Sequence, residues 1–236
     1  MSVIEIPFSF ESGVDKVIGS LRQEGWYLHG SGSDREPYTS EWCKSLDNGI
    51  DALWRGYNII DWGCGYGRFL NYLLTRAVKK FKYYGFELHG AKHGDVLLNF
   101  CKRHYSPLNC ADRLIKFGYV DDDELINEAM GNCNTVLLGS VFTHMGIEDS
   151  LKFLEKFHDF ICKGGIIVFS LIIEKDKYEL VGKGEYGIED GYAVVFHSQK
   201  ELQMLSNKGK YSISNIGSFQ TDHHVKHDIF VLRNNV

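Results

Sequence analysis

Several features that would assign the chain to other classes of protein are missing from it. No apolar run approaches the roughly 20 residues that a helix needs to cross a bilayer. Residues 1–5 show neither the basic segment nor the apolar core of a signal peptide. The 6 cysteines are scattered, without a C-x-x-C pair that would indicate zinc or iron–sulfur chemistry. We therefore expect a cytoplasmic protein with reduced thiols and no membrane partner.

A long basic run is missing as well. The formal net charge is -5, and the densest cluster of lysines, in residues 79–82, is short. Proteins that track a phosphate backbone usually present a basic stripe. The sequence therefore argues against nucleic acid as a partner.

What the chain does contain is the composition of a globular α/β protein. It has 236 residues, of which 44% are hydrophobic and 24% charged, enough for one domain with a sizeable core. We expect residues 1–55 to form a helical N-terminal extension or cap, because apolar residues at 14, 17, 18 and 21 share one helix face. Residues 56–236 are expected to form the main domain, with the whole chain as one folding unit.

The most informative stretch is residues 57–69, which read Y-N-I-I-D-W-G-C-G-Y-G-R-F. The apolar pair Ile59-Ile60 predicts a buried strand, and helix-spaced apolar residues follow from Phe69 onwards. Between them, glycine occupies every second position. A strand, a glycine turn and a helix in this order form the usual binding place for a nucleotide-like ligand.

The spacing of these glycines decides between ligands. A dinucleotide fingerprint, G-x-G-x-x-G, would require glycine at Arg68 or at Leu70, so an NAD(P)-dependent enzyme is a poor match. The text D-x-G-x-G-x-G, from Asp61 to Gly67, resembles motif I of the class I S-adenosylmethionine (SAM) methyltransferases. An acid suits the positive charges of SAM, and bare glycine lets the ligand approach the backbone. A turn of purely structural use remains the alternative.

The rest of the chain continues the alternation of strands and helices. Strands are predicted at 81–87, 114–120, 135–138, 166–173, 211–219 and 228–233, and helices at 91–104, 121–130, 148–161 and after Ser198. Five β-α units followed by an antiparallel pair resemble the seven-stranded class I methyltransferases. The resemblance implies a three-layer Rossmann-like α/β fold, mostly parallel, with a C-terminal antiparallel β-hairpin.

The same resemblance implies which residues would hold SAM. An acid at the end of the second strand accepts hydrogen bonds from both ribose hydroxyls, and Glu87 stands there. After the third strand, Asp121 would meet the adenine amino group, although capping of the next helix is an alternative role for the acids at 121–124. The full expected set is Asp61, Gly63, Cys64, Gly65, Gly67, Glu87, Leu88, Asp121, Ser140 and Phe142.

The text after the fourth strand, S-V-F-T-H-M at residues 140–145, resembles the family's "S-V-F-T-H-L". A hydroxyl acceptor needs a general base, and His144 is placed for this role; His197 is a second candidate. A histidine that only makes backbone hydrogen bonds is the alternative for His144. Residues 222–228, D-H-H-V-K-H-D, contain metal-ligand types, but neighbouring side chains of a strand point apart, so we expect no metal site.

The absence of two motifs restricts the class of methyl acceptor. No D/N-P-P-Y/F/W text follows the fourth strand and no Pro-Cys pair occurs, unlike in methyltransferases of nucleic-acid bases. The resemblance therefore implies a SAM-dependent methyltransferase acting on a small-molecule acceptor, by O-methylation, with S-adenosylhomocysteine (SAH) as product. The alternatives are a non-catalytic SAM-binding module and an N-methyltransferase for a small molecule or a protein. Residues 174–192 would be an acceptor lid or a solvated loop.

Overall fold

The computed structural model describes residues 43–48, 56–76, 78–89, 94–173, 196–209, 211–220 and 226–234. Its centre is one sheet in the order β3-β2-β1-β4-β5-β8-β7. The strands are β1 (Asn58–Trp62), β2 (Phe81–Glu87), β3 (Arg113–Tyr119), β4 (Thr135–Leu138), β5 (Ile166–Ile173), β6 (Phe196–His197), β7 (Tyr211–Gln220) and β8 (Lys226–Asn234). Strands β1 to β5 are parallel, whereas β8 is antiparallel to β5 and β7. The predicted fold is confirmed.

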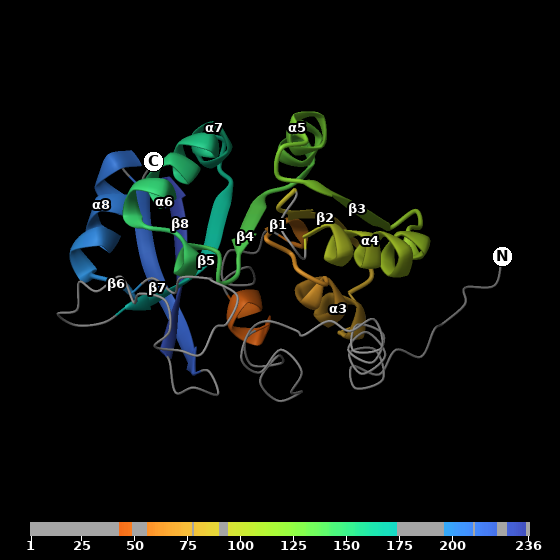
Figure 1. Cartoon of the computed structure of the whole chain (residues 1–236), viewed down its shortest axis with the longest axis horizontal. Helices are drawn as coiled ribbons and strands as arrows, with labels where there is room; N and C mark the ends of the chain where they lie inside the picture. Colours follow the sequence, from red (N-terminus) through yellow and green to blue (C-terminus); the bar gives the residue numbers. More distant parts are fainter. Residues whose placement is uncertain are drawn as a thin grey trace.

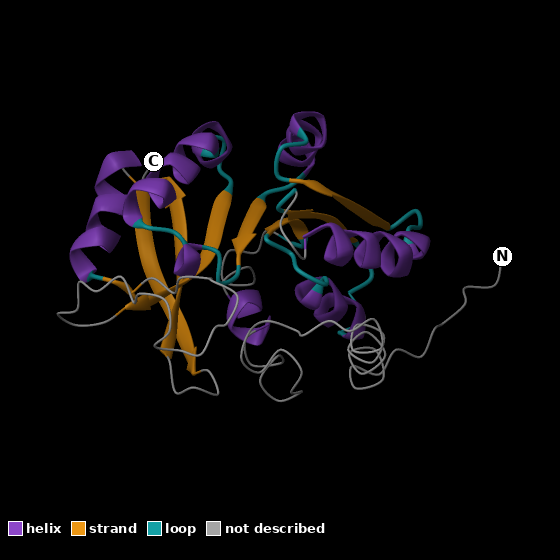
Figure 2. Ribbon diagram, viewed as in Figure 1, coloured by secondary structure: helices purple, strands orange, loops and turns teal. Residues whose placement is uncertain are grey.

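Helices cover both faces of this sheet (Figures 1 and 2). One face carries α5 (Asp123–Asn132), α6 (Ile147–Lys156), α7 (His158–Cys162) and α8 (Gln199–Gly209). The other face carries α3 (Arg68–Thr75), α4 (Gly94–Tyr105) and the helix of residues 43–48. Two short 3₁₀ helices, η1 (Ser106–Leu108) and η2 (Phe142–His144), complete the described elements. The architecture has three layers.

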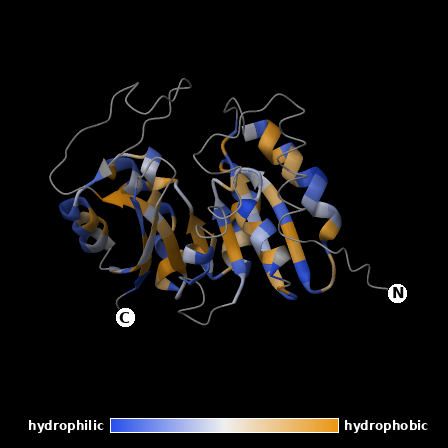
Figure 3. Ribbon diagram, turned by 90° about the horizontal axis from the view of Figure 1, so that it is seen from below, coloured by the Kyte–Doolittle hydropathy of each residue, from blue (hydrophilic) through white to orange (hydrophobic). Residues whose placement is uncertain are grey.

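The central strands are where the sequence pattern was clearest. β5 is buried along its length apart from Ile173, as expected for a strand covered on both faces. Figure 3 shows the apolar residues concentrated in the strands between the helical layers. β2, β4 and β5 begin and end where the sequence predicted. β6 was not predicted, because 2 residues are too short to show a period.

The prediction of one helix over residues 148–161 is wrong. α6 ends at Lys156 and α7 begins at His158, with Phe157 between them at φ -100° and ψ 9°. Phe157 is fully buried, and its ring packs edge-on against Trp62 at 5.3 Å between centroids. The apolar spacing continues across the break because both short helices pack on the same face of the sheet. That is why periodicity did not reveal the break.

The helix of residues 43–48 is attached to α3 by a buried acid. Asp47 is 2% exposed and accepts hydrogen bonds from the hydroxyls of Tyr57 at 2.7 Å and Tyr72 at 3.1 Å. Arg76 forms an ion pair with the same carboxylate. Residues 1–42 and 49–55 lie outside the described ranges, so an N-terminal cap remains a prediction.

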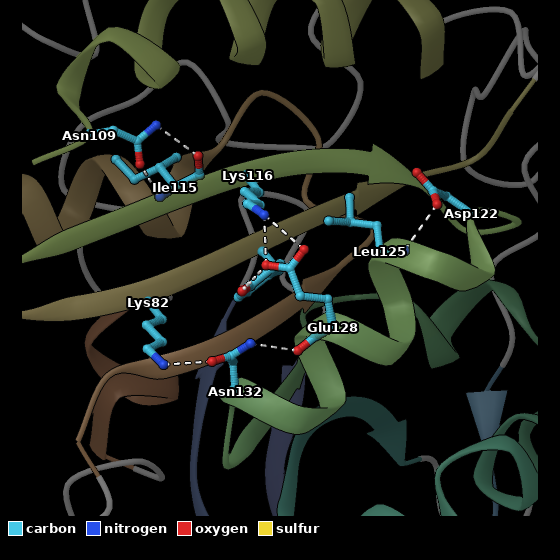
Figure 4. Close-up of polar contacts among 9 residues, drawn as sticks. Lys82, Asn109, Ile115, Lys116, Asp122, Leu125, Glu128 and Asn132 are labelled. Atoms are coloured by element: carbon cyan, nitrogen blue, oxygen red, sulfur yellow. Dashed lines mark hydrogen bonds and ion pairs between the residues drawn. The ribbon is translucent and has the colours of Figure 1, made fainter.

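A polar network fixes α5 on the other end of the sheet (Figure 4). The carboxylate of Glu128 accepts hydrogen bonds from Lys116 at 2.6 and 2.7 Å and from the Tyr84 hydroxyl at 2.8 Å. Lys82 donates to the side chain of Asn132 at 2.7 Å. These contacts attach the second half of α5 to the first residues of β2 and to the middle of β2 and β3. No helix in the described part of the chain combines the length and apolarity needed to span a membrane.

Candidate functional site

The glycine turn after β1 has the conformation that its sequence suggested. Gly63, Gly65 and Gly67 have φ angles of 74°, 56° and 78°, a region that side chains with a Cβ rarely adopt. A Cβ on Gly67, which precedes α3, would lie 2.8 Å from the ring of Tyr105. A Cβ on Gly65 would meet no atom of the described residues within 4 Å. Within the described part of the chain, the backbone at Gly65 is therefore uncovered on the side where a side chain would project.

Glu87, the last residue of β2, faces this turn. Its Oε2 accepts a hydrogen bond from the Gly65 N–H at 2.8 Å, and its Oε1 accepts one from the Leu88 N–H at 3.0 Å. Burial raises the pKa of Glu87, and the two backbone hydrogen bonds partly offset that rise. The two oxygens thus lie next to the uncovered backbone, where they can accept hydrogen bonds from vicinal hydroxyls of a ligand.

Asp61 lies under the same turn. It is 4% exposed, and the Tyr83 hydroxyl donates a 2.5 Å hydrogen bond to its Oδ2. Burial raises the pKa of Asp61 to about 7; the Tyr83 hydrogen bond lowers it, the charge of Glu87 raises it and Arg68 lowers it. A bound cation would favour the ionised form of this carboxyl. Asp61 therefore provides a negative charge that a cationic ligand can stabilise.

Cys64 lies within the turn, but its thiol points into the protein. Cys64 is 6% exposed, and Cys101 of α4 is fully buried beside it. The Cys101 thiol donates to the Gly65 carbonyl at 3.4 Å. The pKa of the Cys64 thiol is raised well above its ordinary value. The main cause is a hydrogen bond with Cys101, and burial is the second cause. The two thiols support the turn from below, and Cys64 can reach a ligand only through its backbone.

For the acids after β3, the sequence left two roles open, contact with the adenine amino group and capping of the next helix. Asp122 caps α5, because its Oδ1 accepts a hydrogen bond from the Leu125 N–H at 3.0 Å (Figure 4). Asp121 instead lies 3.2 Å from Nδ1 of His89. Leu88 beside them is 54% exposed, which is unusual for a large apolar side chain. An exposed apolar surface next to a carboxylate fits a flat base that carries an amino group.

The loop after β4 approaches the glycine turn from the other side. A Cβ on Gly63 would lie 2.9 Å from Cγ2 of Val141. Ser140 has φ 60°, the only positive value among the described residues other than glycine. Phe142 is fully buried, with its ring 5.3 Å from Phe169, so its side chain belongs to the core. The expected contact of Phe142 with a cofactor would therefore have to use its backbone.

Three histidines lie at this edge of the sheet. His144 is exposed at the end of η2, whereas His197 is fully buried with Nε2 3.0 Å from the Phe142 carbonyl oxygen. His197 is therefore unsuited to the role of general base. His227, at the start of β8, is 7% exposed. Burial lowers its pKa to about 4, the charge of His144 adds to that effect, and Asp228 opposes it.

The sequence did not indicate that the charge of His144 would act on His227, because β8 reaches this edge only through the antiparallel end of the sheet. His223 and His224 lie outside the described residues. Within the described ranges, no group of three or more His, Cys, Asp or Glu side chains is arranged to hold a metal ion.

Comparison with known proteins supports the fold. No protein-family model matches the sequence, and no curated protein matches it. Solved structures do match: magnesium protoporphyrin IX methyltransferase from Synechocystis PCC 6803, with bound SAH, has a TM-score of 0.59 at 12% identity, covering 95% of this chain and 97% of its own. A SAM-dependent methyltransferase from Leishmania major has a TM-score of 0.59 at 14% identity, with coverages of 92% and 82%.

A third similar structure is N,N-8-amino-8-demethyl-D-riboflavin dimethyltransferase from Streptomyces davawensis, with a TM-score of 0.55 at 12% identity. The match covers 98% of this chain and 64% of the length of that protein. The chain thus has the class I, Rossmann-like fold of the SAM-dependent methyltransferases. Its glycine turn and its strand-end acid occupy adjacent strands at the carboxyl edge of that fold.

Proposed function

We propose that the protein is a SAM-dependent methyltransferase that transfers a methyl group to the oxygen of a small molecule. The observation that carries the proposal is the contact between Glu87 and the N–H of Gly65, which places a two-oxygen acceptor directly against the uncovered glycine turn. Similar structures crystallised with SAM and SAH support the choice of ligand.

The proposed positions of the cofactor follow from the described side chains. Glu87 would accept hydrogen bonds from the ribose hydroxyls, and the exposed Leu88 would lie against the adenine, with Asp121 near the amino group. Asp61 would face the positive charges of the methionine part of SAM. The backbone of residues 140–142 would line the methyl end.

The chemistry requires little from the protein beyond alignment, because the sulfonium is already a good leaving group. The acceptor oxygen attacks the methyl carbon as the carbon–sulfur bond breaks, and the electron pair remains on sulfur to give SAH. The proton of the acceptor hydroxyl passes to His144, which is exposed at the end of η2. His144 is the residue that we propose as general base.

N-methylation is the second candidate, because a structurally similar protein is a dimethyltransferase of an amino group. We prefer oxygen because His144 is an exposed histidine that could accept the proton of a hydroxyl, and because the neighbouring acid Asp228 is ion-paired with Lys226 at 2.8 Å. A SAM-binding module without catalysis is the third candidate, and it would retain the same cofactor contacts.

Calorimetric titration with SAH tests the cofactor, and binding in the micromolar range is expected. Absence of binding at high micromolar concentration would refute the proposal. Incubation with methyl-labelled SAM and panels of phenols, sugars and amines then separates the three candidates: label on a hydroxyl supports the proposal, label on an amine supports the N-methyltransferase, and no label in any panel supports the non-catalytic module.

A further inference from the structure

The loop between β4 and η2 has a backbone that needs external support. Ser140 has φ 60°, a region that costs conformational energy for a residue with a Cβ and persists only when its surroundings enforce it. Part of the support is local, since the Thr143 hydroxyl donates to the Ser140 carbonyl at 2.6 Å. The remaining support comes from two other strands.

The first external support is Ser170 of β5. Its Oγ accepts a hydrogen bond from the Ser140 N–H at 2.8 Å, and Ser170 is fully buried in the sheet. A serine in the middle of an otherwise apolar strand would be costly if its hydroxyl had no partner. The hydrogen bond to Ser140 explains why the polar side chain is tolerated there.

The second support is His197 of β6. Its Nε2 lies 3.0 Å from the carbonyl oxygen of Phe142. A carbonyl oxygen only accepts, so Nε2 must carry the proton and donate it. His197 is fully buried, and its Nδ1 has no hydrogen-bond partner among the described residues; Oε2 of Glu201 is 3.9 Å away. The imidazole therefore interacts mainly with the loop.

The loop that these two residues hold connects both halves of the site. At one end Val141 lies against Gly63 of the glycine turn, and at the other end η2 presents His144. A change in the Phe142 carbonyl position would therefore move both the contact with the turn and the histidine. Neither Ser170 nor His197 contacts the turn itself in the hydrogen bonds described.

We infer that His197, together with Ser170, is a positioning residue that fixes the loop of residues 139–145 and so aligns the methyl end of SAM with His144. The inference rests on the proposed function, because it assigns the loop to the methyl end of the cofactor. β6 pairs with the end of β5, where His197 lies opposite Ile173. His197 thus contacts the loop from a strand that is itself fixed to β5.

Two substitutions at His197 separate the hydrogen bond from the volume of the ring. His197→Gln keeps an N–H donor, whereas His197→Phe keeps a ring without a donor. Ser170→Ala removes the other support. His158→Phe is the matched control, since His158 of α7 also makes side-chain hydrogen bonds, at 2.6 Å to the Tyr211 hydroxyl and at 3.5 Å to the Cys162 thiol, but lies away from the loop.

Amide hydrogen exchange, SAH titration and thermal unfolding are measured on the full chain. For His197→Phe and Ser170→Ala we expect faster exchange at residues 140–145 and an SAH affinity about tenfold weaker. For His197→Gln we expect both values within about threefold of the wild type. His158→Phe should leave loop exchange and affinity unchanged, even where its unfolding temperature falls.

Unchanged exchange at residues 140–145 in both His197→Phe and Ser170→Ala would overturn the inference. So would equal behaviour of the Gln and Phe variants, because the donated hydrogen bond would then be irrelevant. A wild-type protein that fails to bind SAH overturns the proposed function instead, and the exchange measurements still report whether His197 holds the loop. The two failures are therefore distinguishable.

Discussion

The Glu87 carboxylate and the Gly65 N–H are joined by a 2.8 Å hydrogen bond across the carboxyl edge of β1 and β2. If the ribose of SAM binds there, Glu87→Ala removes charge-assisted hydrogen bonds to the ligand, a net loss of about 1.5–3 kcal/mol. We expect the Kd for SAH to rise about 10- to 150-fold. Calorimetry measures it, with Glu124→Ala on the exposed start of α5 as control. An unchanged Kd in Glu87→Ala would remove Glu87 from the site.

A substitution at Gly65 should affect both the stability of the fold and the access of the ligand to the turn. The described residues leave space for a Cβ, but φ is 56°, so Gly65→Val should destabilise the fold by about 1–2 kcal/mol and also cover the backbone that SAM is proposed to approach. We expect SAH binding to be lost while the protein remains folded. Gly131→Val is the control, because Gly131 also has open space but ordinary helical φ. Measurable SAH binding by Gly65→Val would contradict the assignment of the turn.

The raised pKa of Asp61 predicts that SAH binding is coupled to the release of protons. Its carboxyl has a pKa of about 7, raised by burial from 3.8, so most molecules carry the proton at pH 6. The ammonium group of SAH would favour the ionised form, so binding should release protons and tighten as the pH rises from about 4 to 7. Titration in buffers with different ionisation enthalpies measures the release.

Asp61→Asn should abolish that release, and equal release by both proteins would contradict the prediction. The same shift has a consequence for the ligand-free protein. Because the folded state binds more protons than the unfolded state in this window, Asp61 lowers the free energy of unfolding as the pH rises from about 4 to 7.

His144 should affect turnover and leave cofactor binding alone. Loss of a general base typically reduces kcat by about 10²- to 10⁴-fold. His144→Gln is therefore expected to lower kcat by that factor for a hydroxyl acceptor found by screening, with an SAH affinity close to that of the wild type. Steady-state kinetics and calorimetry provide the two values. A kcat within about twofold of the wild type would assign proton transfer to another group.

Asp47 should affect stability and not chemistry. Its buried carboxylate joins Tyr57, Tyr72 and Arg76, and Asp47→Ala leaves these groups without their common acceptor. We expect a loss of about 3 kcal/mol in the free energy of unfolding, measured with urea. Asp149→Ala breaks only an exposed pair with Lys152 and should cost less than about 0.5 kcal/mol. Equal losses in the two variants would show that the Asp47 network adds nothing.

The main strands of the sheet and the residues of the glycine turn could be predicted from the sequence. Short apolar runs between glycines and polar segments define β1, β4 and β5, because their burial on both faces leaves little choice of residue type. The helix predicted after Ser198 begins with a capping box: the Ser198 N–H donates to Glu201 at 2.7 Å, and the Glu201 N–H donates to the Ser198 hydroxyl at 3.2 Å.

What the sequence could not predict depends on residues far apart in the chain. Nothing near Asp121 and Asp122 says which of them caps α5, since that depends on how β3 ends relative to His89. The support of the Phe142 carbonyl by His197 joins residues separated by more than fifty positions. Phe157, which separates α6 from α7, packs against Trp62 of β1, a contact that no local pattern contains.

The place of β8 has a consequence for how the protein is made. β8 lies between β5 and β7, and it is synthesised after both of them. Until residues 226–234 leave the ribosome, one edge of β5 has no partner strand, and its apolar residues are available to other chains. The segments proposed to bind the cofactor, at the ends of β1, β2 and β4, emerge much earlier, so a nascent chain would carry the glycine turn before its sheet is complete. Shortening the chain before β8 should therefore yield aggregates and not a smaller folded protein.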